Sequence, residues 1–479
     1  MRRLILTFFI FVSIASGQND RARDFLKREM AERKIPGLQA AVVKDGRIVF
    51  LESFGIANIQ NSVAVTNKSV FPIFSCTKAF TGVAIMQLVE EGKLDLSAPI
   101  SKYLDGLPAA WQPVTIRQLL THISGLPNVI PVLDRETLGF SNGQNEDAVW
   151  AKVKELPMEF ETGTRFSYNQ TNYALLGKII DKLTGKPFVD VFAERQFDVA
   201  LMPSTRHGDS RDVIPNMVST YRFVNGVDGK TFAAPRLVAN YVEFPPFRRT
   251  ASGLNSTAED LAKWIMALLD GKLLKPESRA TLWKAGAFNN GHATQWALGW
   301  VTKPRPTHSA ITATGGTRAA IFVYPEDRAA VVILTNLTNS FPEDIADELA
   351  GIYNPAIAAS DPVTALRIQL RKRGFDKALD VYRELKAKDA RFNPLENDLN
   401  DWAYRLMNGG GKPKEALEIF KLNVFLYPQS ANTYDSLADA YNVNGDRPRA
   451  IENYKKSLEL DPKNKRAAEE LKRLEGADE

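Results

Sequence analysis

Runs of β-branched and aromatic residues occur in two separate groups, and this distribution constrains the fold more than any other feature of the sequence. Near the start, two such runs flank Asp45-Gly46, a dipeptide typical of a tight hairpin turn. Four further runs lie far along the chain, at 296–303, 310–316, 319–325 and 329–336. The long stretch between the groups has helical periodicity. The sequence therefore predicts an α+β domain, an α/β sandwich in which helices flank one antiparallel sheet built from both ends, plus a helical subdomain.

The chain of 479 residues is too long for one ordinary hydrophobic core, so we expect more than one domain. The α+β domain is expected to cover residues 20–355. A short stretch at 354–361, which contains alanines and a proline, is interpreted as a linker. Beyond it the pattern is helical throughout, which predicts a separate all-α domain over residues 362–479.

Two stretches of the helical part, 412–428 and 447–462, resemble each other at an offset of 34 residues, which pairs Ala416 with Ala450. Small alanines let helices approach closely, and a proline ends each unit, so the pattern resembles the tetratricopeptide repeat. A degenerate third copy is expected at 374–394, and an unrelated helical bundle is the alternative. Such repeats imply a concave surface that binds a protein or peptide partner.

The first 17 residues have the composition of a secretory signal peptide. Two arginines precede an apolar run, and the small residues Ala15, Ser16 and Gly17 follow it. The run is short for a membrane span, and an uncleaved anchor is the alternative interpretation. We therefore expect an exported protein, periplasmic or secreted, with no membrane span after signal cleavage.

Composition and charge exclude several classes of partner. A hydrophobic content of 44% with 24% charged residues is typical of a soluble globular protein. The formal net charge is +5, and the lysines and arginines are interspersed with acidic residues along the chain. No nucleic-acid partner is therefore expected. The four histidines lack metal-ligand spacing, so neither a metal nor another cofactor is expected, and His122 is interpreted as satisfying main-chain groups. The single cysteine, Cys76, cannot form an intramolecular disulfide and is interpreted as core packing.

A serine and a lysine at S-x-x-K spacing, Ser75 and Lys78, open a long helical pattern. Three residues apart, they share one helix face. An amine held neutral by burial and nearby positive groups can take the proton that a serine hydroxyl loses when it attacks. The helix N-terminus also offers N–H groups where an oxyanion forms. By itself the motif is weak, because serine at a helix start is often an N-cap and lysine is often solvated.

Four blocks of sequence occur in the order found in one family of serine enzymes. They are 71–104, which contains Ser75 and Lys78, then 115–127, 157–188 and 249–264. Over residues 21–353 the chain resembles the class C β-lactamases, the D,D-peptidases and the family VIII carboxylesterases. The resemblance implies an acyl-serine mechanism with Ser75 as the nucleophile and Lys78 beside it.

The second motif of this family, Tyr-x-Asn, falls on Tyr168-Asn169-Gln170. The resemblance implies that Tyr168, with its pKa lowered beside Lys78, exchanges protons with Ser75 and the leaving group. Gln170 replaces the asparagine and keeps an amide that can hydrogen-bond Lys78 and a substrate carbonyl. Without the surrounding blocks, a core or surface aromatic is the alternative for Tyr168.

The third motif, Lys-Thr-Gly or His-Thr-Gly, falls on Ala313-Thr314-Gly315, so its basic residue is absent. The resemblance implies that Thr314 and Gly315 line the substrate site, and that the N–H of Gly316 forms the oxyanion hole together with that of the nucleophile. In β-lactam-recognising members the missing cation helps hold the substrate carboxylate, and family VIII esterases often lack it. We therefore expect ester hydrolysis to exceed β-lactam hydrolysis, and Arg318 is a candidate substitute cation.

A second serine motif, G-x-S-x-G at 139–143, has polar neighbours instead of the strand and helix that a nucleophile elbow needs, and is interpreted as a surface loop. The sequence as a whole predicts a serine hydrolase that acts through an acyl-Ser75 intermediate on a small molecule or peptide containing an ester or amide. It is expected to be esterase-like or D,D-peptidase-like, with weak β-lactamase activity. The alternative is a catalytically weak, penicillin-binding-like domain that binds a peptide or protein together with the repeats.

Overall fold

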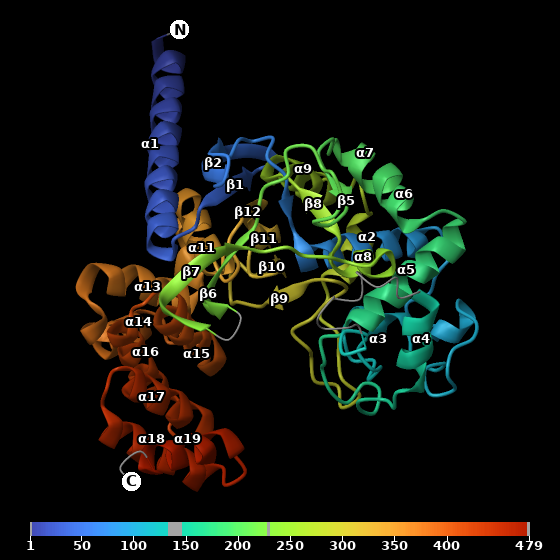
Figure 1. The fold of residues 1–479 in the computed structure, drawn as a ribbon. Coiled ribbons are helices and arrows are strands. Elements are labelled where there is room, and N and C mark those ends of the chain that lie inside the picture. The colour runs from blue at the N-terminus through green and yellow to red at the C-terminus, as the bar shows by residue number, and fades with distance from the viewer. Residues whose placement is uncertain (1, 133–145, 228–229, 477–479) are drawn as a thin grey trace. The chain divides into compact units, whose positions relative to one another are not determined.

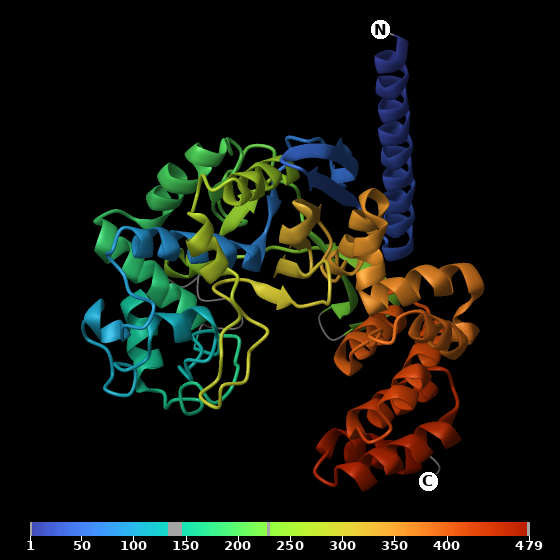
Figure 2. The ribbon, with the colours of Figure 1, turned by 180° about the vertical axis from the view of Figure 1, so that it is seen from behind.

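The chain forms two compact units that divide between Ala350 and Gly351, just before the boundary expected at 355. Residues 31–33 group with the second unit. Strands are gathered in the first unit, and the second unit is helical (Figures 1 and 2). The computed structural model describes residues 2–132, 146–227 and 230–476.

The main sheet has seven strands within the described residues, and every neighbouring pair is antiparallel. In spatial order they are β3 (Val63–Ala64), β2 (Arg47–Asn58), β1 (Gly37–Lys44), β12 (Ala329–Thr335), β11 (Ala319–Tyr324), β10 (Ala310–Gly315) and β9 (Val301–Lys303). The N-terminal hairpin thus joins the C-terminal strands through β1 and β12, with Ala41 opposite Val332. The predicted antiparallel sheet built from both ends of the domain is confirmed.

One predicted strand is much shorter than expected. Of the run at 296–303, only Val301–Lys303 is extended, as β9. Gly299 has φ +90, and a Cβ there would lie 2.3 Å from the main-chain oxygen of Lys78. A left-handed glycine that passes this close to another backbone interrupts an extended strand, so the chain enters the sheet only after it.

Helices cover both faces of the main sheet, as expected for an α/β sandwich. On one face α9 (Ala258–Leu269) packs against β1 and β12, in a core shared with α2 (Thr77–Glu90). On the other, the hydroxyl of Tyr324 donates to Asp347 of α11 (Glu343–Tyr353) at 2.8 Å. β11 and β12 are buried along their whole length, which explains why both read as continuous apolar runs.

The helical subdomain and two small sheets lie between the strands of the main sheet in sequence. The subdomain and flanking helices include α1 (Arg2–Arg33), α3 (Ile116–Leu120), α4 (Glu146–Glu155), α5 (Gln170–Thr184), α6 (Phe188–Phe192), α7 (Asp198–Ala200), α8 (Arg249–Ser252) and α10 (Pro276–Leu282). The small sheets are β4 (Phe71–Pro72), β8 (Leu254–Ser256) and β5 (Arg206–His207), and the pair β6 (Tyr221–Val227) and β7 (Lys230–Ala239). α2, α5 and α8 pack together beside the main sheet (Figure 1), and this junction holds the candidate site.

The N-terminal helix includes the segment predicted as a signal peptide. α1 runs from Arg2 and ends where Lys34 adopts φ +55. In the part of the chain that the structure describes, no helix combines the length and apolar character that crossing a bilayer requires. The signal peptide remains a prediction.

The second unit contains no strand among its described residues. Its helices are α12 (Pro355–Ser360), α13 (Pro362–Arg373), α14 (Ala378–Lys388), α15 (Glu396–Tyr404), α16 (Pro413–Leu426), α17 (Ala431–Val443), α18 (Arg447–Leu460) and α19 (Lys465–Glu475). The stretch interpreted as a linker instead forms α12. The side chain of Asn354 accepts from the N–H of Ala356, and Pro355 occupies the first helical position, so this short segment carries both signals of a helix start.

The last four helices follow the 34-residue period of the sequence. α16 and α18 begin 34 residues apart, as do α17 and α19. Ala416 and Ala450 are both fully buried, and Gly411 and Gly445, which precede α16 and α18, both have positive φ. Equivalent positions therefore have equivalent environments, while the assignment to the tetratricopeptide class remains a prediction.

Candidate active site

Ser75 lies in a 3-10 turn, Phe74–Cys76, that leads directly into α2. Phe74 has φ +47, a left-handed conformation that bulky residues rarely adopt. The Thr77 hydroxyl donates to the carbonyl of Phe74 at 2.6 Å and accepts from the N–H of Leu254 at 3.1 Å, which ties the turn to β8. Ser75 is therefore held, half-buried, on a strained turn at the start of a buried helix.

Cys76, next to it, points into the core. It is fully buried, and its Sγ lies 3.4 Å from the carbonyl oxygen of Ala313 and 3.8 Å from that of Ala319. Burial raises the pKa of the thiol, which disfavours the reactive thiolate. Its environment agrees with the interpretation of core packing.

Lys78 is fully buried beside Ser75. Its Nζ lies 3.4 Å from Ser75 Oγ, and it donates to Gln170 Oε1 at 3.0 Å and to the carbonyl of Ala251 at 2.8 Å. Burial, and then the positive charge of Arg248, lower the pKa of Lys78 well below its usual value. Both causes favour the uncharged amine.

Tyr168 and Gln170 are brought to the same point by the start of α5. The Nζ of Lys78 lies 4.7 Å from the centroid of the Tyr168 ring. Burial raises the pKa of Tyr168 to about 12, although hydrogen bonds with Ser75 and Gln170 act in the opposite direction. The expected lowering of this pKa is wrong, because the adjacent amine is itself driven toward its neutral form and offers little charge to stabilise a phenolate.

His122 is a buried residue that packs against the ring of Tyr168. Its ring centroid lies 4.5 Å from that of Tyr168, and its Nδ1 accepts from the N–H of Asn169 at 3.1 Å. Burial, and then Lys78, lower the pKa of His122 well below its usual value, so the imidazole stays neutral. His122 therefore satisfies a main-chain donor, as expected, and fixes the turn that carries the phenol.

The end of β10 runs alongside the turn that carries Ser75. A Cβ on Gly315 would lie 2.0 Å from the carbonyl oxygen of Ile73 and 3.1 Å from the nitrogen of Ser75, so this approach requires glycine. Gly316 follows with φ +55. Within the described residues, neither the N–H of Ser75 nor that of Gly316 donates to a main-chain acceptor. Thr314 is the exposed residue of β10 and borders the same edge.

Comparison with known proteins identifies the family. Residues 22–352 match the protein family described as Beta-lactamase. The chain belongs to the Beta-lactamase family. The match covers more than half of the chain and includes Ser75, Lys78 and Tyr168, and the resemblance predicted from the sequence is confirmed. This family consists of serine hydrolases that share the fold described above.

Two curated relatives and two solved structures show the range of this Beta-lactamase family. An N-acetylmuramyl-L-alanine amidase of Bacillus subtilis (strain 168) is 26% identical, over 71% of this chain and 87% of that protein. A penicillin-binding protein of the same organism is 28% identical over 61% of this chain, and the match spans 66% of its length, slightly less than two thirds.

The structure of a penicillin-binding protein homologue from Pyrococcus abyssi has 26% identity and a TM-score of 0.57, over 71% of this chain and 76% of that one. A D-amino acid amidase from Ochrobactrum anthropi SV3 has 22% identity and a TM-score of 0.59, over 71% and 99%, and shows the fold alone.

Arg318, the candidate substitute for the cation missing from the third motif, is not accessible to a substrate. Arg318 is 3% exposed, and its Nε donates to the hydroxyl of Thr338 at 3.0 Å. Its guanidinium lies over the ring of Phe74, 4.6 Å from the centroid. Arg318 is buried against Phe74 rather than presented to a substrate, so the interpretation of Arg318 as a substitute cation is wrong.

Two groups of the site were missed in the sequence. The carbonyl of Ala251 is a main-chain group, which no side-chain pattern reveals. Arg248 immediately precedes the block at 249–264 and looks like any surface arginine in the sequence, yet its charge acts on Lys78 and Tyr168. The one indication in the sequence is that Arg248 lies between Pro245-Pro246 and the block at 249–264 that resembles the family.

The G-x-S-x-G motif at 139–143 lies outside the described residues. Among the residues that the structure describes, no group of three or more histidine, cysteine, aspartate or glutamate side chains is placed to hold a metal ion. A cavity of about 220 Å³ is lined by Asp209, Phe244 and Asn255 among others, and Ser75 and Lys78 are not among its lining residues.

Proposed function

We propose that the protein is a serine hydrolase that cleaves ester, amide or peptide bonds through an acyl-Ser75 intermediate. The observation that carries this proposal is the set of contacts of Lys78 Nζ. A neutral amine has two N–H bonds and one lone pair. The oxygens of Gln170 and Ala251 accept the two N–H groups, and the lone pair is left to accept the proton of Ser75 Oγ at 3.4 Å.

In the first step, the Oγ–carbon bond to the substrate carbonyl forms as the Ser75 proton moves to Lys78. The main-chain N–H groups of Ser75 and Gly316, which lack main-chain acceptors among the described residues, donate to the carbonyl oxygen as it becomes negative. Removal of one such donor typically lowers kcat by about a hundred- to a thousandfold.

In the second half of acylation, the carbon–oxygen or carbon–nitrogen bond of the substrate breaks and the leaving atom takes a proton. Tyr168 stays protonated because its pKa is about 12, so its hydroxyl can donate to the leaving atom and be reprotonated from Lys78. Water then attacks the acyl carbon and releases Ser75. Thr314 and Gly315 line the edge along which the substrate lies.

Esters are proposed to be better substrates than β-lactams. The reason is that Ala313 occupies the position where family members that recognise β-lactams carry a cation. The relatives named as an amidase and as a penicillin-binding protein support bond cleavage next to an acyl carbon. Turnover of a short-chain p-nitrophenyl ester is expected to exceed that of a chromogenic cephalosporin. The reverse ranking contradicts this assignment.

Intact-protein mass spectrometry after treatment with a fluorophosphonate tests the activity itself. One adduct per chain is expected in the wild type and none in Ser75→Ala. An Arg165→Met chain, which keeps the nucleophile and alters only an exposed side chain, is the control and should still be labelled. Failure of every acylating agent to label the wild type would favour the alternative, a penicillin-binding-like domain that only binds.

We also propose that the second unit, as a set of tetratricopeptide-like repeats over 362–479, binds a protein or peptide, and that the chain is exported to the periplasm or outside. The 34-residue spacing of α16 to α19 supports the first, and the composition of residues 1–17 supports the second. N-terminal sequencing of the exported protein tests cleavage after the predicted signal.

A further inference from the structure

Arg248 is a half-buried cation, with its Nε fully buried, close to the turn that carries the nucleophile. It ends the 3-10 helix η4 (Pro246–Arg248), which packs against α5. Its guanidinium carbon lies 5.2 Å from the centroid of the Phe244 ring, and this ring meets that of Phe74 edge-on at 5.9 Å. Phe74 directly precedes the nucleophile, so two packed rings connect the guanidinium to the Ser75 turn.

The charge of Arg248 reaches the reacting groups. It lowers the pKa of Lys78, where it is the largest cause after burial, and it also acts to lower that of Tyr168. The 3-10 helix that Arg248 ends packs against α5, which begins at Gln170, and against α8, which contains Ala251. Lys78 donates to both of these residues, so Arg248 lies on elements that contact Lys78 directly. Arg248 is therefore part of the electrostatic environment of the bond that the enzyme is proposed to cleave.

Arg248 differs from the arginines around it in having no ionic partner. Arg249 pairs with Asp209 at 3.4 Å and with Asp212 at 2.8 Å, and Arg211 pairs with Asp209 at 2.6 Å. Across the described part of the chain, Arg248 has no carboxylate partner, and its buried Nε has no hydrogen-bond partner. Burial lowers the pKa of Arg248 to about 10, so it still carries its charge at neutral pH.

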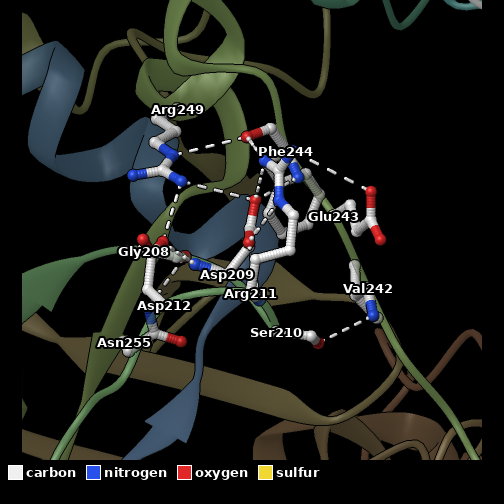
Figure 3. Close-up of polar contacts among 10 residues, drawn as sticks. All are labelled: Gly208, Asp209, Ser210, Arg211, Asp212, Val242, Glu243, Phe244, Arg249 and Asn255. Atoms are coloured by element: carbon white, nitrogen blue, oxygen red, sulfur yellow. Dashed lines mark hydrogen bonds and ion pairs between the residues drawn. The ribbon is translucent and has the colours of Figure 1, made fainter. Parts of the chain in front are cut away.

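Asp209 binds the main chain of Phe244 and the side chain of Arg249, two residues that flank Arg248 in the sequence (Figure 3). The carboxylate of Asp209 accepts from the N–H of Phe244 at 2.8 Å and pairs with Arg249, which itself donates from Nε to the carbonyl of Phe244 at 3.3 Å. Arg211 donates to the same carbonyl at 3.3 Å. This Asp209 clamp holds the ends of the segment 244–249 while leaving the side chain of Arg248 unpaired.

A charge withdrawn from water without a partner costs free energy, and a rigid backbone prevents it from relaxing into solvent. A guanidinium offers two parallel N–H donors that match a carboxylate. We infer that Arg248 binds a carboxylate group of the substrate and supplies the cation that the third motif lacks at Ala313. The preferred substrates are therefore esters, amides or peptides that carry a free carboxylate near the scissile bond. This inference rests on the proposed acyl-serine function.

Matched substrate pairs test it. In one pair, phenylacetylglycine is esterified with 3-carboxyphenol or with 3-carbamoylphenol. In the other, phenyl esters of glycine carry an N-succinyl or an N-succinamoyl group. Each pair differs by one carboxylate against a neutral amide of similar size, on the leaving-group side or on the acyl side. The ratio of kcat/KM within a pair measures carboxylate recognition and cancels any effect on Lys78 that both members share.

In the wild type, at least one pair is expected to favour the acid. In Arg248→Met this preference should fall by about ten- to a hundredfold, the range for a charge-assisted hydrogen bond. Arg248→Lys, which keeps the charge without the two parallel donors, should restore part of it. Arg165→Met removes an exposed positive charge three residues from Tyr168 and should leave the ratio unchanged.

Wild-type ratios near one for both pairs overturn the inference without any variant, and so do ratios that survive in a folded Arg248→Met or Arg248→Gln chain. An equal loss on acid and amide in Arg248→Met also overturns it, because Arg248 then acts through Lys78 or through the fold. In each of these cases turnover and fluorophosphonate labelling persist in the wild type, and the proposed function stands. Absence of both turnover and labelling in the wild type overturns the two together.

Discussion

The end of β10 and the segment 244–251 reach the nucleophile from different elements and bring opposite kinds of group. β10 contributes main-chain donors and glycines and no charge, and it is held by the sheet ladder, with Gly315 opposite Ala319. The segment 244–251 contributes an acceptor, the carbonyl of Ala251, and a cation, Arg248, and it is held by the Asp209 clamp. At the end of β10 the main-chain N–H groups take the proposed role directly. In the segment 244–251 the main chain positions a charged side chain.

With Arg248 in its proposed role, the loss of a charged residue from a family motif does not leave the site without a charge. A strand edge tolerates few substitutions, because each residue is fixed by its register. A loop tied down at its ends by one buried carboxylate can carry a different side chain between those ends. The cation of such a site can therefore belong to either edge while the nucleophile and the oxyanion donors remain in place.

Replacement of Lys78 by methionine sharpens the comparison most, because both edges depend on this amine. Loss of a general base lowers turnover by about a hundred- to ten-thousandfold. We expect kcat/KM of Lys78→Met for a neutral ester to fall within that range, with thermal unfolding little changed, because methionine fills the buried space without a polar group. Arg165→Met, which keeps the amine and removes only an exposed charge, is the control. Near-normal turnover in Lys78→Met would show that another group accepts the proton.

The substitution Gly315→Ala tests the uncharged edge. Its Cβ would meet the carbonyl of Ile73 at 2.0 Å and push β10 away from the nitrogen of Ser75. We expect kcat to fall by about a hundredfold, as for a displaced oxyanion donor, and stability to fall by about 1–3 kcal/mol from overpacking. Gly409→Ala, where nothing lies within 4 Å of the added carbon, is the control and should change neither. Unchanged kcat would remove Gly315 from the site.

The pH dependence of turnover tests the charged edge. Lys78 must be neutral to accept the proton, so kcat/KM for a neutral ester should rise as pH rises through the lowered pKa of Lys78. Removing the Arg248 charge takes away one cause of that lowering. In Arg248→Met the pKa of Lys78 therefore rises and the acidic limb moves to higher pH. Arg165→Met should leave the limb in place. Tyr168, with a pKa of about 12, should add no basic limb below that pH.

Asp209 is a positioning residue, and its substitution should have the smallest effect. In Asp209→Asn the clamp loses its charge, and the acid-over-amide ratio of the substrate pairs should fall by about two- to tenfold, the range for one hydrogen bond. A purely structural loss would lower both members equally. Ser210→Ala removes the acceptor for the N–H of Val242 in the same loop and leaves the Asp209 clamp intact, so its ratio should not change. An unchanged ratio in Asp209→Asn would separate the clamp from recognition.

Much of the fold could be predicted because it depends on local pattern. The Asp45-Gly46 hairpin, the apolar runs of β10 to β12 and the S-x-x-K spacing each lie within a few residues, and both groups of strands must meet to bury their side chains. The stretch interpreted as a linker is helical because Asn354 caps it and its alanines favour a helix. The strand predicted at 296–300 does not form because Gly299 passes close to α2.

The electrostatics of the site could not be predicted in the same way. Whether Arg248 is paired depends on Asp209 and Asp212, which lie some distance away in the sequence and are occupied by Arg211 and Arg249. The pKa of Tyr168 depends on the balance between burial and hydrogen bonds, which only the packed site sets. Motif spacing identifies which side chains meet, and burial decides their protonation.

The single thiol of the chain is buried next to Ser75, against the carbonyls of Ala313 and Ala319. Its chemical modification can therefore report unfolding of this domain. An aromatic disulfide reagent can reach Cys76 only when α2 separates from β10, which also dismantles the catalytic residues. At reagent concentrations where modification is faster than reclosing, the rate of thiol modification should equal the rate at which the enzyme opens. A ligand that binds only the closed site should slow this rate.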